Sequence, residues 1–410
     1  LYGVFIILIY VSLSLPFHLV DSLNPQILND LSTSVFLNLI FFIVFIFFAF
    51  SFFGYYELTL PVFFLNKTES KSSISGIIGI FFMSLTLALV SFSCTGPILG
   101  SLLVGSLSIN GGAYQLTAGM LGFGISLALP FAMLALFPNL IKNLPKSGAW
   151  MKKFKITLGF MELALALKFL SNADLVSGWG FLKREVFILI WLILSLLLSI
   201  YLLGLVKMTD EKKSNIEKIF GLTSLIFSIY LLNGLVSKEN KLKFVSGFTP
   251  PVFYSLFSNT NDCPLNLDCY KNFKAAREKA KSQNKPILID FTGWACVNCR
   301  RVEENIWSNP EVYDILKNKF IISSLYVDDR KKLSPDESFN FKFPDGRIKK
   351  IRTIGEKWST FQLQNFNSAS QPYYIMIHPN GRILNYPIQY TSSVNKYRNW
   401  LNKGLDNYGL

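Results

Sequence analysis

The amino-acid sequence predicts a polytopic α-helical membrane domain followed by a smaller mixed α/β domain. The first observation is composition, since 51% of the 410 residues are hydrophobic and 38 of them are Phe. The mean hydropathy of +0.36 is high for a soluble protein and low for a purely membrane-embedded one. The second observation is the separation of an apolar half from a charged half, and the third is a strand–helix pattern confined to the charged half.

The apolar and charged halves of the chain meet near residue 236. Residues 1–236 contain 14 Lys/Arg and 10 Asp/Glu, whereas residues 237–410 contain 26 and 16. The net charge of +14 therefore divides into +4 and +10. The basic residues form no dense block and accompany no nucleic-acid motif. We interpret them as the surface of a soluble domain and expect no nucleic-acid partner.

Seven apolar stretches in the first half approach the roughly 20 residues that a spanning helix requires. They are residues 1–20, 34–54, 75–97, 114–137, 155–172, 186–206 and 217–236. Lys residues gather in the loops 55–74, 138–154 and 207–216, and short cytoplasmic loops collect Lys and Arg. The pattern predicts a multi-pass protein of the inner (cytoplasmic) membrane, with residues 1–237 as the membrane domain and the charged half on the periplasmic side.

The start of the chain has the character of a membrane helix. Residues 1–20 contain no Met and no cationic segment, which argues against a signal peptide. Because Leu1 already lies inside an apolar run, we expect that the sequence is cut and that further residues precede it.

The charged half divides into a linker, residues 238–272, and an α/β domain, residues 273–410. "KPILIDFTG" and "KFIISSLYVD" predict buried strands, and "KNFKAAREKAKSQ" and "CVNCRRVEENIW" predict helices. Residues 328–360 are polar and are expected to form an inserted loop. "QPYYIMIHPNGRIL" predicts a β-hairpin around an Asn-Gly turn, and residues 392–405 predict a closing helix.

Cys296 and Cys299 form a CxxC motif that follows one predicted strand and opens a helix. The free N–H groups and the dipole at a helix N-terminus stabilise a thiolate, so the pKa of Cys296 is expected to fall from about 8.5 toward about 7 or below. The first thiolate would attack a partner disulfide and Cys299 would resolve the mixed disulfide. Asp290, six residues before Cys296, could take the proton from Cys299 if it is buried.

The cysteines of this half have alternative interpretations. A CxxC can also be half of a zinc site, but such sites usually need four ligands, and only Cys263, Cys269 and His378 are available nearby. The strand–CxxC–helix context favours redox chemistry. Cys263 and Cys269 are close enough to form a small disulfide in an oxidising compartment, with free thiols or a redox role as the alternatives.

The membrane half contains two further candidates. Cys94 lies in an apolar run with Gly96 and Pro97 directly after it, and broken helices at membrane depth line protein or a water-filled cavity. Its alternative is a small packing residue. Glu162 lies inside the fifth predicted span and is a functional candidate by default, with an interfacial Glu as the alternative.

The motif residues resemble the thioredoxin family, through Trp294, Cys296, Cys299, Asp290 and Pro372. This resemblance implies a thioredoxin-like fold for residues 273–410. It also implies a cis peptide bond before Pro372, with that proline packed against the CxxC.

Together with "FGYYELTLP", "SCTGPILG" and "LPKSGAWMKKFKITLGF", the whole chain resembles the DsbD family of transmembrane thiol–disulfide reductases. The resemblance implies electron flow from cytoplasmic thioredoxin to a membrane cysteine pair that includes Cys94, then to the C-terminal domain, then to extracytoplasmic thiol–disulfide proteins. It places an acidic residue, Glu303, beside the active site, where the alternative is a solvated helix face. It implies no cofactor. The family has eight membrane helices and an N-terminal periplasmic domain, so the first helix, with the partner of Cys94, is expected upstream of Leu1.

Two other functions remain open from the sequence. One is a cytochrome c maturation factor of the CcdA type, which the fused thioredoxin-like domain disfavours. The other is a membrane anchor that only tethers a thioredoxin domain, which would need one helix rather than seven and no Cys94.

Overall fold

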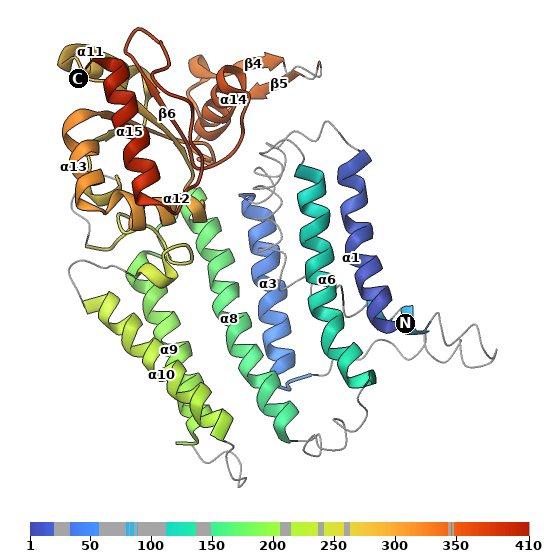
Figure 1. The fold of residues 1–410 in the computed structure, drawn as a ribbon. Coiled ribbons are helices and arrows are strands. Elements are labelled where there is room, and N and C mark those ends of the chain that lie inside the picture. The colour runs from blue at the N-terminus through green and yellow to red at the C-terminus, as the bar shows by residue number, and fades with distance from the viewer. Residues whose placement is uncertain are drawn as a thin grey trace. The chain divides into compact units, whose positions relative to one another are not determined.

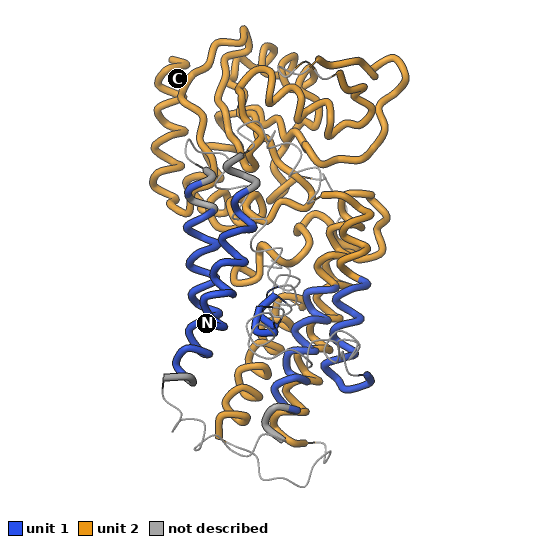
Figure 2. Tube along the Cα trace, turned by 90° about the vertical axis from the view of Figure 1, so that its right-hand side faces the viewer, with its two compact units in different colours: residues 1–32, 43–166 blue, residues 33–42, 167–410 orange. Residues whose placement is uncertain are grey.

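The computed structural model describes residues 1–19, 33–56, 79–81, 83–85, 88, 112–136, 149–205, 215–236, 242–257, 263–342, 346 and 348–409. These residues divide into two compact units, coloured separately in Figure 2. The first comprises residues 1–32 and 43–166, and the second comprises residues 33–42 and 167–410.

Within the described residues, long helices occupy six of the seven predicted spans, and Figure 1 labels each of them. They are α1 (Tyr2–Leu19), α3 (Val35–Phe52), α6 (Gly112–Leu136), α8 (Ala149–Ser177), α9 (Arg184–Leu203) and α10 (Asn215–Val236). The predicted span 75–97 lies mostly outside the described residues. By length and composition, α3, α9 and α10 are able to cross a membrane, and α1 and α6 contain the shorter apolar segments 2–15 and 117–133.

In the first unit, α1 and α6 pack closely because small residues lie between them. Gly124 brings α6 so near that an added Cβ would lie 3.1 Å from Cα of Ile7. Tyr10 lies edge-on to Phe123 and donates a hydrogen bond to the carbonyl of Ala88. In lipid there is little hydrophobic drive between helices, so such close packing and hydrogen bonding hold a helix pair together.

In the second unit, hydroxyl groups join α9 to α10. Ser199 donates to the carbonyl of Gly221 at 2.9 Å, and Ser228 donates to Oγ of Ser195 at 2.9 Å. Ser224 donates to the carbonyl of Ser195 at 2.9 Å. In lipid, hydrogen bonds between helices hold such a pair together alongside close packing of small residues.

The C-terminal part contains a four-stranded sheet with the order β1-β3-β2-β6. Its strands are β1 (Cys269–Tyr270), β2 (Ile287–Thr292), β3 (Ile321–Tyr326) and β6 (Tyr373–Ile377). β1 and β2 run parallel to β3, and β6 runs antiparallel to β2, with Asp290 opposite Tyr374. β1 lies within the range predicted as linker, so the sheet begins before residue 273.

Helices cover both faces of this sheet (Figure 1). α11 (Phe273–Gln283) and α14 (Ile354–Phe366) pack on the face that contains Ile287, Ile289 and Phe291. The opposite face contacts α12 (Val297–Val302), the π-helical turn η3 (Glu303–Trp307), α13 (Pro310–Lys319) and α15 (Val394–Tyr408). Because side chains alternate along a strand, Asp290 shares this second face with Leu288.

The sequence predicts an inserted loop for residues 328–360, but the structure contains regular elements there. They form the hairpin β4 (Phe339–Lys342) with β5 (Ile348–Ile351), and the first half of α14. Thr353 and Glu356 begin α14 with a reciprocal capping box. The predicted hairpin after Pro372 forms its turn, and its second arm pairs with β6 through the isolated bridges Tyr374–Ile388 and Ile377–Ile383 rather than through a continuous ladder. Short 3₁₀ turns complete the fold: Lys243–Val245, Pro264–Asn266 and Pro335–Glu337.

Candidate active site

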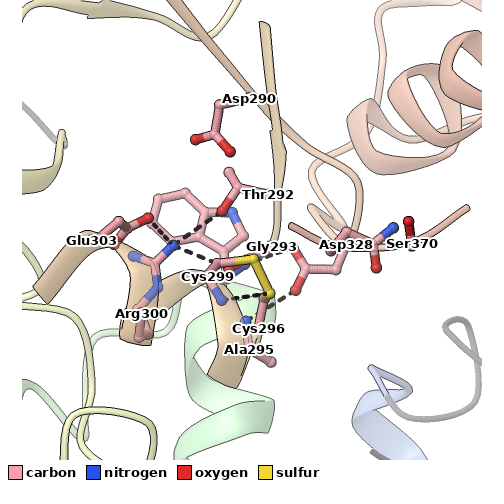
Figure 3. The surroundings of a disulfide bond; sticks show 12 residues. Asp290, Thr292, Gly293, Ala295, Cys296, Cys299, Arg300, Glu303, Asp328 and Ser370 are labelled. Carbon is pink, nitrogen blue, oxygen red and sulfur yellow. Dashed lines mark hydrogen bonds and ion pairs between the residues drawn. A yellow bond between two sulfur atoms is a disulfide. The ribbon is translucent and has the colours of Figure 1, made fainter. Parts of the chain in front are cut away.

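The cysteine pair lies just after β2, at the start of α12. The strand ends at Thr292, and Cys296 occupies the N-cap of the helix, where its Sγ accepts a hydrogen bond from the backbone N–H of Cys299 at 3.2 Å. The two cysteines form a disulfide (Figure 3). Cys299 is fully buried, whereas Cys296 is partly exposed. An attacking thiol must be reached by its partner, so this difference in exposure suits Cys296 to that role.

Asp328, just after β3, fixes the loop that precedes the cysteines. Its carboxylate accepts hydrogen bonds from the backbone N–H groups of Trp294 at 2.8 Å and Ala295 at 3.0 Å. Gly293 leaves room for this carboxylate, because an added Cβ would lie 2.8 Å from its Oδ2. Burial raises the pKa of Asp328 to about 6, and the two hydrogen bonds oppose that rise by favouring the carboxylate.

Three charged groups lie buried beside the disulfide (Figure 3). Arg300 pairs with Glu303 at 2.8 Å and donates to Oγ1 of Thr292 at 3.2 Å. Asp290 accepts a hydrogen bond from Ser324 at 3.2 Å. Burial raises the pKa of Asp290 to about 7 and that of Glu303 to about 8, although Arg300 lowers both. The carboxyls are thus able to exchange protons near neutral pH.

Aromatic rings surround the exposed side of the motif. Trp294 stacks on Tyr326 with ring centroids 4.2 Å apart, and Nζ of Lys271 lies 5.0 Å from the centroid of the Trp294 ring. Phe253 meets Trp294 edge-on at 6.0 Å. The Trp294 ring is therefore held directly before the cysteines by contacts from the sheet side and from the residues before it.

The structure brings together four of the predicted site residues, which are Cys296, Cys299, Asp290 and Glu303. Glu303 is 4% exposed, so it is not on a solvated helix face. Pro372 is buried at the start of β6, and the Gln371–Pro372 peptide bond is cis.

The other predicted residues lie elsewhere. Cys269, in β1, is joined in a disulfide to Cys263, six residues earlier, with 6.1 Å between their Cα atoms. Glu162 is a buried residue of α8, 7% exposed. Cys94 lies outside the described residues. Within the described parts of the chain, no group of three or more His, Cys, Asp or Glu side chains is arranged to hold a metal ion.

Three contributors to the site were not found from the sequence. Arg300 directly follows the motif, and it is 3% exposed. Asp328 and Tyr326 reach the motif from β3, and only the pairing of β2 with β3 brings them there. The run "YVDD" at the end of a predicted strand was the available signal for Asp328, because strand ends gather at one edge of a parallel sheet.

Two family models match the chain. "Cytochrome C biogenesis protein transmembrane domain" matches residues 7–173, and "Thioredoxin-like" matches residues 268–344. The chain is thus similar to DsbD-type membrane domains in its apolar half and to thioredoxin-like proteins in its charged half. This confirms the predicted fold class, a helical membrane domain followed by a thioredoxin-like α/β domain. It also agrees with the resemblance seen in the membrane-domain motifs.

Proteins named "Thiol:disulfide interchange protein DsbD" are similar to most of this chain. That of Campylobacter jejuni is 26% identical over 310 residues, covering 74% of this chain and 50% of the relative. That of Pectobacterium atrosepticum is 26% identical over 321 residues, covering 76% and 48%. That of Haemophilus ducreyi is 28% identical over 292 residues, covering 68% and 45%. The chain spans about half the length of these DsbD proteins.

Proposed function

We propose that this protein is a protein-disulfide reductase that relays electrons from cytoplasmic thioredoxin, through a membrane cysteine pair that includes Cys94, to Cys296 and Cys299. These cysteines would then reduce disulfides of extracytoplasmic proteins. The observation that carries the proposal is the cysteine pair at the start of α12, with its partly exposed Cys296 and buried Cys299. The DsbD-type membrane domain in the same chain supports a relay rather than a simple anchor.

The chemistry is two successive thiol–disulfide exchanges. The Cys296 thiolate attacks one sulfur of the acceptor disulfide, which releases the other acceptor sulfur as a thiolate. The Cys299 thiolate then attacks Sγ of Cys296, which releases the second acceptor thiolate and closes the Cys296–Cys299 disulfide. Two electrons pass to the acceptor, and the membrane pair must return two electrons before the next cycle.

Asp290 and Glu303 are proposed to manage the protons of these exchanges. Both carboxyls are buried beside the motif, and burial raises both pKa values to near neutrality. A carboxyl that titrates near neutral pH can take the proton from Cys299 before the resolving step and give it up once the acceptor thiolate has been released. Pro372 and Trp294 would shape the surface on which the acceptor segment lies. Glu162 stays a candidate for a role within the membrane domain.

The lysine distribution supports an inner-membrane protein with its thioredoxin-like domain on the periplasmic side. We assign residues 1–237 to the membrane domain, 238–272 to the linker region and 273–410 to the body of the thioredoxin-like domain. Strand β1 adds Cys269 and Tyr270 to that body.

A trapping experiment tests the order of attack. The Cys299→Ala variant, expressed in cells, should accumulate mixed disulfides with acceptor proteins, because Cys296 attacks and nothing resolves the bond. The Cys296→Ala variant should accumulate none. Non-reducing gel electrophoresis after acid quenching measures both, and equal trapping by the two variants would show that the assignment of Cys296 is wrong.

A further inference from the structure

Arg184, the first residue of α9, is fully buried, with no exposed surface. Its Nη1 donates to Oγ1 of Thr249 at 3.3 Å and to the carbonyl of Pro250. The same nitrogen lies 3.5 Å from Oε1 of Glu304, in the turn that continues the CxxC helix. One guanidinium therefore joins a membrane helix, the linker and the redox domain. A buried cation is costly unless such partners surround it.

The linker segment, defined as residues 242–257, is anchored on the membrane-domain side by a second set of contacts. The hydroxyl of Tyr254 donates to Asp174 at 2.9 Å, near the end of α8, and the carbonyl of Tyr254 accepts from the backbone N–H of Arg184 at 2.9 Å. Glu185 accepts hydrogen bonds from the backbone N–H of Leu256 and from Ser255. The segment is thus held to both sides of the α8–α9 connection.

The other side of the linker segment covers the residues around the cysteines. Gly247 lies against Val297, inside the CxxC motif, so closely that an added Cβ would be 2.6 Å from Cγ1 of Val297. Phe253 contacts Trp294, before the motif, and its ring centroid lies 5.3 Å from the guanidinium carbon of Arg300, after it. The segment therefore fits the CxxC end of the domain rather than an arbitrary part of its surface.

We propose that Arg184, Glu304 and the linker segment form a docking surface that holds the CxxC end of the thioredoxin-like domain at the start of α9, and that the domain accepts electrons while it is docked there. This rests on the relay proposed above and adds a specific place for its intramolecular step. Docking restricts the motion of the CxxC end relative to α9 more than the covalent connection alone would. Glu304 is a positioning residue in this scheme, because it acts through Arg184 and not on a cysteine sulfur.

Glu304→Ala tests the docking surface in the full chain, embedded in membranes. The change leaves Arg184 buried without its carboxylate, and breaking a buried pair in this way is strongly destabilising. Amide hydrogen exchange of residues 247–257 should accelerate at least tenfold. Exchange of β2 should be unchanged, which shows that the domain remains folded. Glu311→Ala is the matched control, because Glu311 pairs with Arg398 on the exposed surface of the same domain.

A second readout on the same variants measures electron transfer. Membranes are supplied with reduced thioredoxin, and alkylation of free thiols followed by gel electrophoresis gives the rate at which Cys296 and Cys299 become reduced. We expect Glu304→Ala to slow this reduction at least tenfold and Glu311→Ala to leave it unchanged. Tyr254→Phe, which removes one hydroxyl from the other anchor, should act in the same direction as Glu304→Ala.

The two readouts separate the proposals. Faster exchange with an unchanged reduction rate would overturn the docking role, and unchanged exchange in Glu304→Ala would overturn the docking surface itself. If the wild-type pair were never reduced by thioredoxin, the relay would be wrong, and the exchange data alone would still decide whether Arg184 and Glu304 hold the linker segment in place.

Discussion

Replacing Asp290 by Asn should change how the stability of the thioredoxin-like domain depends on pH. Asp290 is 1% exposed, and its burial raises its pKa from 3.8 to about 7. A carboxyl whose folded-state pKa lies above its unfolded value stabilises the fold in its protonated form. That contribution is complete below about pH 4 and is lost as the pH rises through about 7.

The magnitude follows from the size of the shift. About three pKa units at about 1.4 kcal/mol each give a loss on the order of 4 kcal/mol, more than half of it between pH 5 and pH 8. Asn keeps a hydrogen-bonding partner for Ser324 but carries no ionisable proton. The variant should therefore lose about 2 to 3 kcal/mol less than the wild type over that interval.

Urea unfolding of the oxidised segment 263–410 at pH 5 and pH 8 measures this difference. With slopes typical of small domains, the wild-type midpoint should fall by about 1 M more than that of Asp290→Asn. Glu303, whose pKa burial raises to about 8, contributes a further loss that both proteins share. Equal pH dependence in the two proteins would refute the claim that Asp290 is held protonated by burial.

Three more predictions concern the relay and its placement. Cys94→Ser should abolish reduction of the Cys296–Cys299 disulfide in cells while protein abundance stays normal, and normal reduction, measured by thiol alkylation, would return Cys94 to a packing role. A membrane-impermeant amine reagent added outside intact cells should label residues 238–410 and spare Lys142 to Lys153, and the opposite pattern would reverse the topology. Gly293→Ala should lower the disulfide-reductase rate of the domain about tenfold, because the new Cβ would lie 2.8 Å from Oδ2 of Asp328 and displace that carboxylate. An unchanged rate would show that the Asp328 carboxylate is not needed to hold the loop before Cys296.

Local sequence pattern was sufficient to predict the strand and helix that carry the cysteines. The run "ILIDFT" is uniformly buried, as a strand central to a sheet should be, and the CxxC follows it directly. The Asp290 side chain could be placed by alternation along the same strand. These inferences depend only on residues that are close together in the sequence.

The contacts that complete the site could not be predicted in that way. The pairing of Arg300 with Glu303, and of Asp328 with the loop at Trp294, depends on burial that arises only when helices and β3 pack against β2. The sequence predicts a loop for residues 328–360 because polar residues interrupt the apolar pattern there. The capping box at Thr353 indicates the start of the helix. The Asp-Gly pair before β5 indicates the hairpin turn. Composition alone does not reveal either element.

The disulfide between Cys263 and Cys269 limits how far the redox domain can travel. It closes the seven residues from Cys263 to Cys269 into a ring, so this stretch cannot extend when the domain moves. Leu267, inside this ring, is 1% exposed and packs in the core on the second face of the sheet. The hydroxyl of Tyr313 also donates to the carbonyl of Leu265 at 3.4 Å. The ring therefore moves as one body with the thioredoxin-like domain, and any displacement of that domain from α9 has to come from residues before Cys263.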